Sequence, residues 1–254
     1  MVSPGNLLVS SREGSRENLE LISKHPEIRS RLMTWTKAVF LMLSTGSESN
    51  PGLLAVSTSQ PIEGPPKDAG ISARERAMWE KRAEVSIPVK KKAKTASSTG
   101  DDAGGNAEDS GIVQVRHFDG GPLQRGDPIC VAQVANAEAW EERVRGVQAI
   151  PGNWIFGSYP AVAAVAEAVA SGAGTSSGRT RKFTINVVWG YGGWGGTQIL
   201  AETARGGWGM VTVDQYTEHH PDPELEMDWL LDFEWSRIVS MARLAPKTEY
   251  TTRR

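Results

Sequence analysis

A glycine-rich stretch directly after a short apolar run constrains the fold of this chain more than any other feature. Residues 183–189 (FTINVVW) are apolar and rich in β-branched side chains, which indicates a buried strand. Five glycines follow within residues 190–196, where we expect a loop. A short helix over residues 198–205 and a strand over residues 208–213 come next. A strand, a glycine loop, a helix and a strand in this order predict one unit inside a sheet-containing domain.

Further strands and helices are expected on both sides of this unit. Apolar runs and alternation predict strands at residues 5–10, 37–43, 53–57, 112–118, 127–134 and 154–158. Helical spacing predicts helices at residues 12–31 (broken at Pro26), 161–170 and 227–245. The turn residues at positions 50–52 predict an antiparallel hairpin between the second and third strands. We expect all of these elements to form one domain that spans residues 1–254.

Residues 63–111 differ in composition from the rest of the chain. They hold few large apolar side chains and many small polar ones, which cannot offset the entropy cost of ordering. Within them, residues 72–84 predict one short helix, anchored by Met78 and Trp79. We therefore expect a largely disordered insertion that carries a single helix.

Composition excludes several classes of protein. The formal net charge of −2 gives no whole-chain attraction to nucleic acid or to acidic membranes. The single cysteine, Cys130, excludes an internal disulfide and fits a reducing intracellular compartment. The sequence contains no run of 18 apolar residues, so no membrane span is expected. The first residues lack the features of a targeting segment. The sequence thus predicts a soluble intracellular protein.

Several segments share their spacing with motifs of one protein family. The strongest match is a G-Y-x-G-W-G-x-x-Q-x-x-x-E…W pattern, filled by Gly190, Tyr191, Gly193, Trp194, Gly195, Gln198, Glu202 and Trp208. Weaker matches are residues 120–124 (GGPLQ), the start of the chain at residues 5–9, and Trp235 in the last helix. On these residues the chain resembles the AlgH/YqgE family, also called UPF0301 or DUF179. The resemblance covers about four fifths of the chain, and residues 63–111 form an enlarged insertion within it.

The resemblance implies a fold but no reaction. It implies an α+β domain with a mixed, strongly bent β-sheet flanked by helices. Members have been described as transcriptional regulators in some bacteria, and relatives in photosynthetic eukaryotes look plastid-directed, so a plastid or the cytoplasm is the implied location. Two polar motifs of the family are missing here. Residues 58–61 keep only the proline of Asn-Arg-Pro, and residues 130–132 replace a Leu-His pair.

The glycine stretch also satisfies a dinucleotide-binding pattern. Gly190, Gly192 and Gly195 fit G-x-G-x-x-G between a strand and a helix, and Asp214 ends the next expected strand. Backbone N–H groups would then face a pyrophosphate at the helix N-terminus. The alternative is that the glycines permit a tight turn and let Tyr191 and Trp194 pack against neighbouring elements.

Gln198 and Glu202 form the second candidate for a site. They are four residues apart, so they share a face of the expected helix above the glycine stretch. Together with Tyr191 and Trp194 they could line a polar pocket rimmed by aromatic rings. The structural alternative is that Glu202 accepts hydrogen bonds from loop amides and Gln198 fastens the turn.

For three other features we favour a structural or solvent-exposed role over a binding or catalytic one. The basic run at residues 90–94 (KKKAK) could contact phosphates, but acidic residues follow it, so a solvated tether is favoured over a nucleic-acid arm. Adjacent histidines in a strand or loop tend to point apart, so no metal site is predicted at His219 and His220. Cys130 lies in an apolar strand and is expected to be inert. We assign no catalytic residue and no cofactor.

Nine tryptophans shape the leading functional hypothesis. We expect those in the last quarter to tie the C-terminal helix to residues 183–214. The alternative is that some of them form an exposed patch for a partner. The leading hypothesis is a non-enzymatic AlgH-like domain, a structural or regulatory module that binds another protein through an aromatic surface. The alternatives are a small-ligand or nucleotide-binding protein that uses residues 190–196, and a nucleic-acid-associated regulator.

Overall fold

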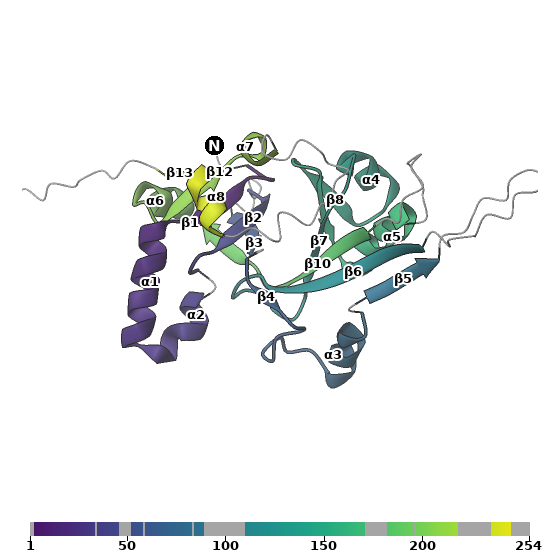
Figure 1. The fold of residues 1–254 in the computed structure, drawn as a ribbon, viewed down its shortest axis with the longest axis horizontal. Coiled ribbons are helices and arrows are strands. Elements are labelled where there is room, and N and C mark those ends of the chain that lie inside the picture. Colours follow the sequence, from purple (N-terminus) through teal and green to yellow (C-terminus); the bar gives the residue numbers. More distant parts are fainter. Residues whose placement is uncertain are drawn as a thin grey trace, which may run out of the picture.

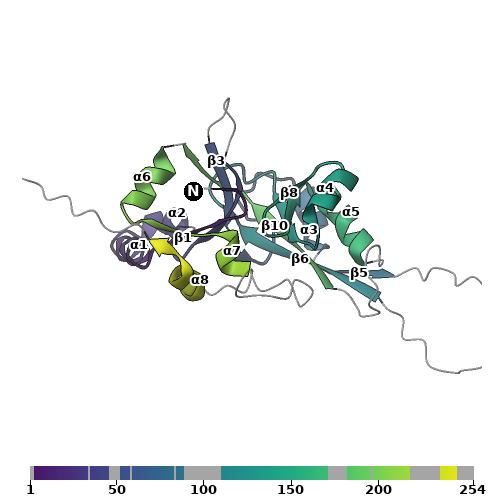
Figure 2. The ribbon, with the colours of Figure 1, turned by 90° about the horizontal axis from the view of Figure 1, so that it is seen from above.

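The fold is of the α+β class, with mixed and strongly bent β-structure flanked by helices, as the sequence predicts (Figure 1). A computed structural model describes residues 3–33, 35–45, 52–57, 59–82, 84–88, 110–170, 182–195, 197–217 and 235–244. Its strands form two sheets, here called sheet A and sheet B. They occupy opposite halves of the molecule, and long central strands reach from one half toward the other (Figure 2).

Sheet A is antiparallel throughout. Its strand order is β11 (Gly192–Gly195), β3 (Gly52–Ser57), β2 (Val39–Ser44), β1 (Leu7–Ser10), β12 (Trp208–Val211) and β13 (Arg243–Leu244). The predicted hairpin of β2 and β3 is confirmed, because Leu41 pairs with Val56 in antiparallel register. The sheet therefore combines the two ends of the chain with the glycine stretch.

Sheet B is mixed. Its order is β4 (Pro61–Ile62), β6 (Ser110–Asp119), β10 (Lys182–Trp189), β7 (Ile129–Gln133), β9 (Trp154–Gly157) and β8 (Val147–Ile150). The β6–β10 pair is parallel, and every other described pair is antiparallel. A further strand, β5 (Glu84–Pro88), pairs with β6 from within the range expected to hold only a helix.

Alternation along the central strands builds three apolar clusters. In β2, Leu41 packs between the two sheets, while Phe40 and Met42 pack on the outer face of sheet A. In β10, Val188 packs between the sheets, and Trp189 packs on the outer face of sheet B. Both faces of these strands are thus buried, which explains why they read as continuous apolar runs rather than as alternating ones.

Helices cover the outer faces. The helices α4 (Ala137–Arg143) and α5 (Tyr159–Ala170) pack on sheet B, with Val162 and Val165 of α5 fully buried. The helix α3 (Ala73–Glu80) has a Ser72–Glu75 capping box and buries one residue, Trp79. Near sheet A lie α6 (Gln198–Ala204), α7 (Val213–Thr217) and α8 (Trp235–Met241).

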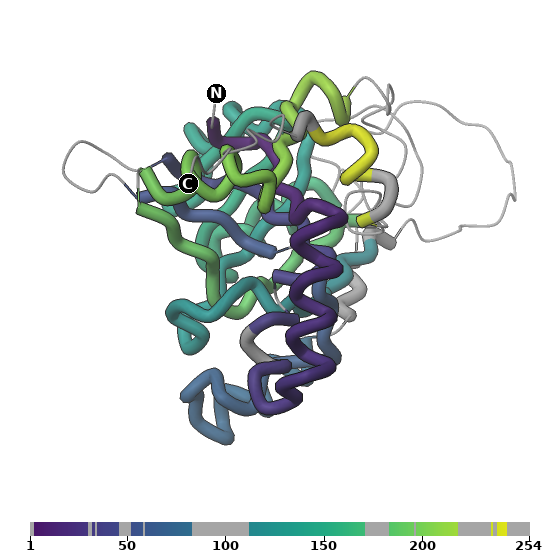
Figure 3. Tube along the Cα trace, turned by 90° about the vertical axis from the view of Figure 1, so that its left-hand side faces the viewer, coloured from purple at the N-terminus to yellow at the C-terminus, as the bar shows by residue number. Residues whose placement is uncertain are grey.

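The first helices form an arm that extends away from the sheets. It consists of α1 (Arg12–Lys24), a 3-10 turn η1 (Pro26–Ile28) and α2 (Arg29–Met33). In Figures 1 and 3 the purple helix α1 runs outward from the end of β1, and α2 turns back beside it. The close contacts of α1 are with η1 and α2. Pro26 lies at the predicted break.

Two sequence expectations differ from the described structure. The glycine stretch is not a loop, because residues 192–195 form β11 in sheet A. The strands before and after it, β10 and β12, consequently lie in different sheets rather than in one unit. Of the helix expected over residues 227–245, the structure shows Trp235–Met241 as α8, whereas Arg243–Leu244 form strand β13 and not helix; residues 218–234 lie outside the described part. No helix in the described ranges is long and apolar enough to cross a membrane.

Candidate functional site

The glycine stretch is the place where the chain crosses from sheet B to sheet A. Gly190 follows β10 directly and has φ of 81°, a conformation that favours glycine. An ideal Cβ at Gly190 would lie 2.2 Å from the carbonyl oxygen of Gly121. Beyond it, Tyr191 exchanges two backbone hydrogen bonds with Leu123. The crossing is therefore closed by the segment around residues 120–123, and a larger side chain at position 190 has no room.

Trp194 and Trp208 belong to a buried aromatic cluster on the outer face of sheet A. Their ring centroids are 5.9 Å apart at 87°, and Phe40 lies 5.5 Å from Trp194 and 5.8 Å from Trp208. Trp35 stacks on Phe40 at 5.3 Å. Edge-to-face packing of this kind is the favoured geometry of aromatic rings. Only 4% of Trp194 is exposed, so its ring is part of a core rather than of a binding surface.

Glu202 of α6 fastens this cluster. Its Oε2 accepts the indole N–H of Trp208 at 2.9 Å and that of Trp194 at 3.2 Å. Its Oε1 accepts the side-chain amide of Gln198 at 2.9 Å. Both carboxylate oxygens therefore have donors from this chain, and we refer to these four residues as the Glu202 clasp. The clasp joins α6 to β11 and β12.

Gln198 also reaches the edge of sheet A. Its Oε1 accepts the backbone N–H of Gly195 at 3.3 Å, so that N–H points away from β3. Because backbone groups alternate in an antiparallel ladder, those of Gly193 and Tyr191 point the same way. Tyr191 is paired with Leu123, and Gly195 with Gln198, so the edge is protected at both ends.

The structure thus brings most of the sequence-derived candidates together. Five of them form one hydrogen-bonded network: Trp194, Gly195, Gln198, Glu202 and Trp208. Gly190 and Tyr191 lie at the crossing between the sheets, and the exposed Gly193 lies between the two groups. The contacts of this network are internal, which favours the structural alternative over a ligand pocket.

The dinucleotide pattern does not have the geometry its motif requires. Gly190, Gly192 and Gly195 would have to form a loop that ends at a helix N-terminus. Instead, a Cβ at Gly192 would lie 2.8 Å from the ring of Trp194, so that glycine faces an indole. Asp214 lies in α7 rather than at the end of a strand. The alternative of a nucleotide-binding glycine loop is therefore not supported, because Gly192–Gly195 form an edge strand packed on an aromatic core.

The C-terminal helix α8 lies against both β1 and β12, but the tryptophan that holds it differs from those we expected. Trp235 of α8 donates its indole N–H to the carbonyl oxygen of Ser10 at 2.9 Å. Ser10 belongs to β1, next to the start of the arm. Trp194 and Trp208 instead pack with Trp35 and Phe40. The expectation that these rings fasten the last helix to residues 183–214 is therefore wrong for Trp194 and Trp208.

Sequence reasoning missed a buried histidine on the other sheet. His117 of β6 accepts the indole N–H of Trp189 at its Nδ1, over 2.9 Å, and the two rings stack. Burial lowers the pKa of His117 from its ordinary 6.5 to about 4. Alternation in residues 112–118 predicts the strand, but nothing in the sequence pairs His117 with Trp189, 72 positions later. The neutral ring acts here as a hydrogen-bond acceptor in the core.

The cysteine is buried, as expected. Burial raises the pKa of the Cys130 thiol from 9.0 to about 12, so little thiolate forms at neutral pH. Among the described residues, no group of three or more histidine, cysteine or acidic side chains is placed to hold a metal ion. The basic run at residues 90–94 and the histidine pair at residues 219–220 lie outside the described ranges.

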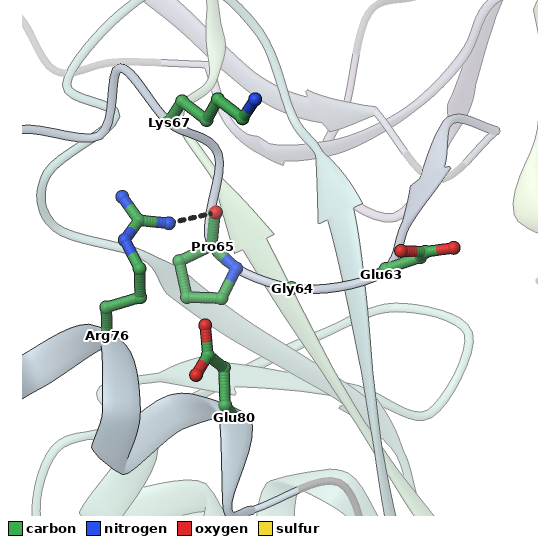
Figure 4. Close-up of a pocket in the computed structure, with 6 residues that line it drawn as sticks. All are labelled: Glu63, Gly64, Pro65, Lys67, Arg76 and Glu80. Atoms are coloured by element: carbon green, nitrogen blue, oxygen red, sulfur yellow. Dashed lines mark hydrogen bonds between the residues drawn. The ribbon is translucent and has the colours of Figure 1, made fainter.

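A polar hollow lies between α3 and the loop before it (Figure 4). It has a volume of about 570 Å³ and is lined by Glu63, Gly64, Pro65, Lys67, Arg76 and Glu80. Arg76 donates to the carbonyl oxygens of Pro65 and Pro66, so its guanidinium holds the loop against the helix. Two acidic and two basic side chains line the hollow without a common focus. The arrangement fits loop anchoring better than a ligand site.

Comparisons with known proteins identify similar folds. No protein-family model matches the sequence, and no curated protein matches it. Among solved structures, protein DIP2367 from Corynebacterium diphtheriae is similar at 14% identity and a TM-score of 0.44, over 84% of this chain and 76% of that one. The AlgH protein from Pseudomonas aeruginosa is similar at 13% identity and a TM-score of 0.38, over 91% of this chain and 95% of that one.

Proposed function

We propose that this chain is a non-enzymatic AlgH-like module, structural or regulatory in role, that binds another protein through the apolar side of its α1–α2 arm. The sequence pointed to an aromatic surface, but the rings of Trp194 and Trp208 are buried. The arm takes the place of that surface in the proposal. The observation that carries it is that the arm leaves its own apolar side chains incompletely covered.

The apolar residues of the arm are all partly exposed. They are Leu19, Leu21 and Ile22 in α1, Ile28 in η1, and Leu32 and Met33 in α2, and Leu21 lies across α1 from Leu19. Ser15, near the root, is the one buried residue within α1. An isolated helix of 13 residues is marginal in water, and it gains most of its stability from packing of its apolar face. The arm therefore presents a face that gains stability when a partner covers it.

The root of the arm is held firmly, so the face is presented in a fixed direction. The Ser15 hydroxyl lies 3.0 Å from the Ser10 hydroxyl and accepts the backbone N–H of Lys37 at 3.0 Å. Ser10 in turn accepts the backbone N–H of Ala38 at 2.7 Å. The chain enters the arm at Ser10 and leaves it at Lys37, so these bonds join entry and exit. A preorganised surface loses less entropy when it binds.

The occupant that fits this face is an amphipathic helix of a partner protein. Such a helix covers exposed apolar side chains with its own apolar residues at spacings i, i+3, i+4 and i+7. The rim of α1 carries both signs of charge, with Lys24 bonded to Glu20 at 2.7 Å. A mixed rim selects a helix with mixed charge rather than a polyanion such as nucleic acid.

The test compares two substitutions of equally exposed leucines. Leu19 is 42% exposed and lies toward the apolar side of α1, whereas Leu21 is 45% exposed and lies two residues on, across the helix. Co-purification of the tagged full chain from its native source, followed by mass spectrometry, identifies the partner. A synthetic helix from that partner should bind the purified chain, lose binding with Leu19→Glu and retain it with Leu21→Glu. Equal binding of the helix to the wild type, Leu19→Glu and Leu21→Glu would overturn the assignment of the arm as the binding surface.

A further inference from the structure

Two aromatic rings from different helices form a corner around a guanidinium group. The centroids of Trp79 and Tyr159 lie 5.0 Å apart, and their planes meet at 83°. The guanidinium carbon of Arg82 lies 4.6 Å from the Trp79 centroid and 4.1 Å from the Tyr159 centroid. Both distances are within the range of a cation–π interaction. We refer to Trp79 and Tyr159 as the aromatic corner.

The aromatic corner is rigid because other rings support it from behind. Trp79 packs edge-on against Trp189 at 5.5 Å and against His117 at 6.0 Å. Trp189 is itself fixed by its hydrogen bond to His117. Trp79 is buried, while Tyr159 and Arg82 are half-buried, so solvent reaches the open side of the corner. A fixed pair of walls with one open side is what recognition of a flat cation requires.

The cation is held by the rings rather than by an ion pair. Among the described residues, no carboxylate forms a salt bridge with Arg82. Arg82 lies just after α3, and its backbone N–H donates to the carbonyl oxygen of Trp79 at 3.0 Å. Its side chain therefore folds back onto its own helix and reaches Tyr159 of α5 from there. Replacement of the Arg82 guanidinium by another cation therefore breaks no ion pair between described residues.

We infer that the aromatic corner is a binding site for a guanidinium group, occupied by Arg82 in this structure and able to accept an arginine side chain of another protein in its place. A guanidinium is flat and weakly hydrated, so it stacks on aromatic faces better than a compact ammonium does. This site lies between α3 and α5, apart from the α1–α2 arm. The inference is independent of the proposed function.

The experiment removes the Arg82 side chain from the aromatic corner and tests whether a guanidinium compound in solution binds there. In full-length Arg82→Ala, methylguanidinium at millimolar concentration should raise the melting temperature saturably, relative to the same concentration of methylurea. Methylurea has a similar shape but no charge. The wild-type protein should show a much smaller rise, since Arg82 already fills the site. Arg82→Ala with Tyr159→Leu should show none, because one wall is missing.

A further comparison uses arginine in a peptide and as the free amino acid, and a second variant covers the case that Arg82→Ala does not fold. A short arginine-containing peptide and free arginine should both stabilise Arg82→Ala, and a matched citrulline peptide should not. If Arg82→Ala does not fold, Arg82→Gln takes its place, since it keeps part of the side chain but has no guanidinium group. Equal effects of methylguanidinium and methylurea, or an unsaturable effect in every variant, would overturn the inference.

Discussion

Trp208 donates its indole N–H to the carboxylate of Glu202 over 2.9 Å, and this bond joins strand β12 to helix α6. Trp194 of β11 donates to the same oxygen. Trp194 in the glycine stretch and Trp208 in the next strand of the chain therefore share one acceptor. A motif that suggests a ligand site in the sequence is satisfied from within the protein.

Removal of this acceptor should be costly. In Glu202→Ala, two largely buried indole N–H groups lose their partner, and each unpaired buried donor costs about 1–3 kcal/mol. We expect the free energy of unfolding to fall by about 2–4 kcal/mol in urea titrations. Glu17→Ala, at an exposed position of α1, is the control and should stay within about 0.5 kcal/mol of wild type. A Glu202→Ala protein as stable as the control would mean that the clasp is not structural.

The glycines of the stretch should differ sharply from one another. Gly190→Ala places a Cβ 2.2 Å from a carbonyl oxygen at a φ of 81°, so we expect a loss of about 2–4 kcal/mol. A Cβ at Gly195 meets no atom within 4 Å, so Gly195→Ala should be nearly neutral. Thermal unfolding of the two variants measures the difference. Similar losses at both positions would contradict the crossing between the sheets.

Part of the fold was predictable because it depends on local pattern. The apolar runs of β1, β2 and β10 predict strands from local sequence alone, and Pro26 predicts the break in the arm. The glycine stretch was not predictable as a strand, since glycine has a low strand propensity and β11 exists through pairing with β3. The strand β5 likewise depends on β6, which begins more than twenty residues later.

The residues of the candidate site could be predicted from the sequence, but their structural role could not. Spacing places Gln198 and Glu202 on one helix face, and the structure agrees. The aromatic cluster that they fasten could not be predicted, because Trp35 and Phe40, which pack on Trp194, lie more than 150 positions away in sequence. Tertiary packing fills the space above the glycines with indole rings, which a motif read from one segment does not reveal.

Acid should destabilise the protein through His117. Its pKa is near 6.5 when unfolded and about 4 when folded, so the unfolded state binds the extra proton more readily. The stabilising contribution is complete above pH 6.5 and is lost as the pH falls from 6.5 toward 4. His117→Gln offers an uncharged acceptor to Trp189, so its unfolding midpoint in urea should depend less on pH over this range. Identical pH profiles for wild type and His117→Gln would contradict this role.

Nucleotides should not bind at the glycine stretch. The space opposite Gly190 and Gly192 is filled by Gly121 and by the ring of Trp194. A panel of nucleotides at a hundredfold excess over a typical dissociation constant would stabilise a true binder by about 2.7 kcal/mol. We expect no shift in melting temperature. A shift that Gly193→Val abolishes, while Gly64→Val in the loop before α3 leaves it intact, would restore the nucleotide hypothesis.

Site-specific photo-crosslinking tests the central claim most directly. A photoreactive amino acid at position 19 lies on the apolar side of the arm, and the same probe at position 138 lies on the exposed side of α4. In native extract, we predict that position 19 captures one protein through a segment of helical, amphipathic spacing, and that position 138 does not. Purified chain alone should give no crosslinked dimer from position 19. Capture of a second copy of this chain, or equal capture from both positions, would contradict the proposal that the arm binds a partner helix.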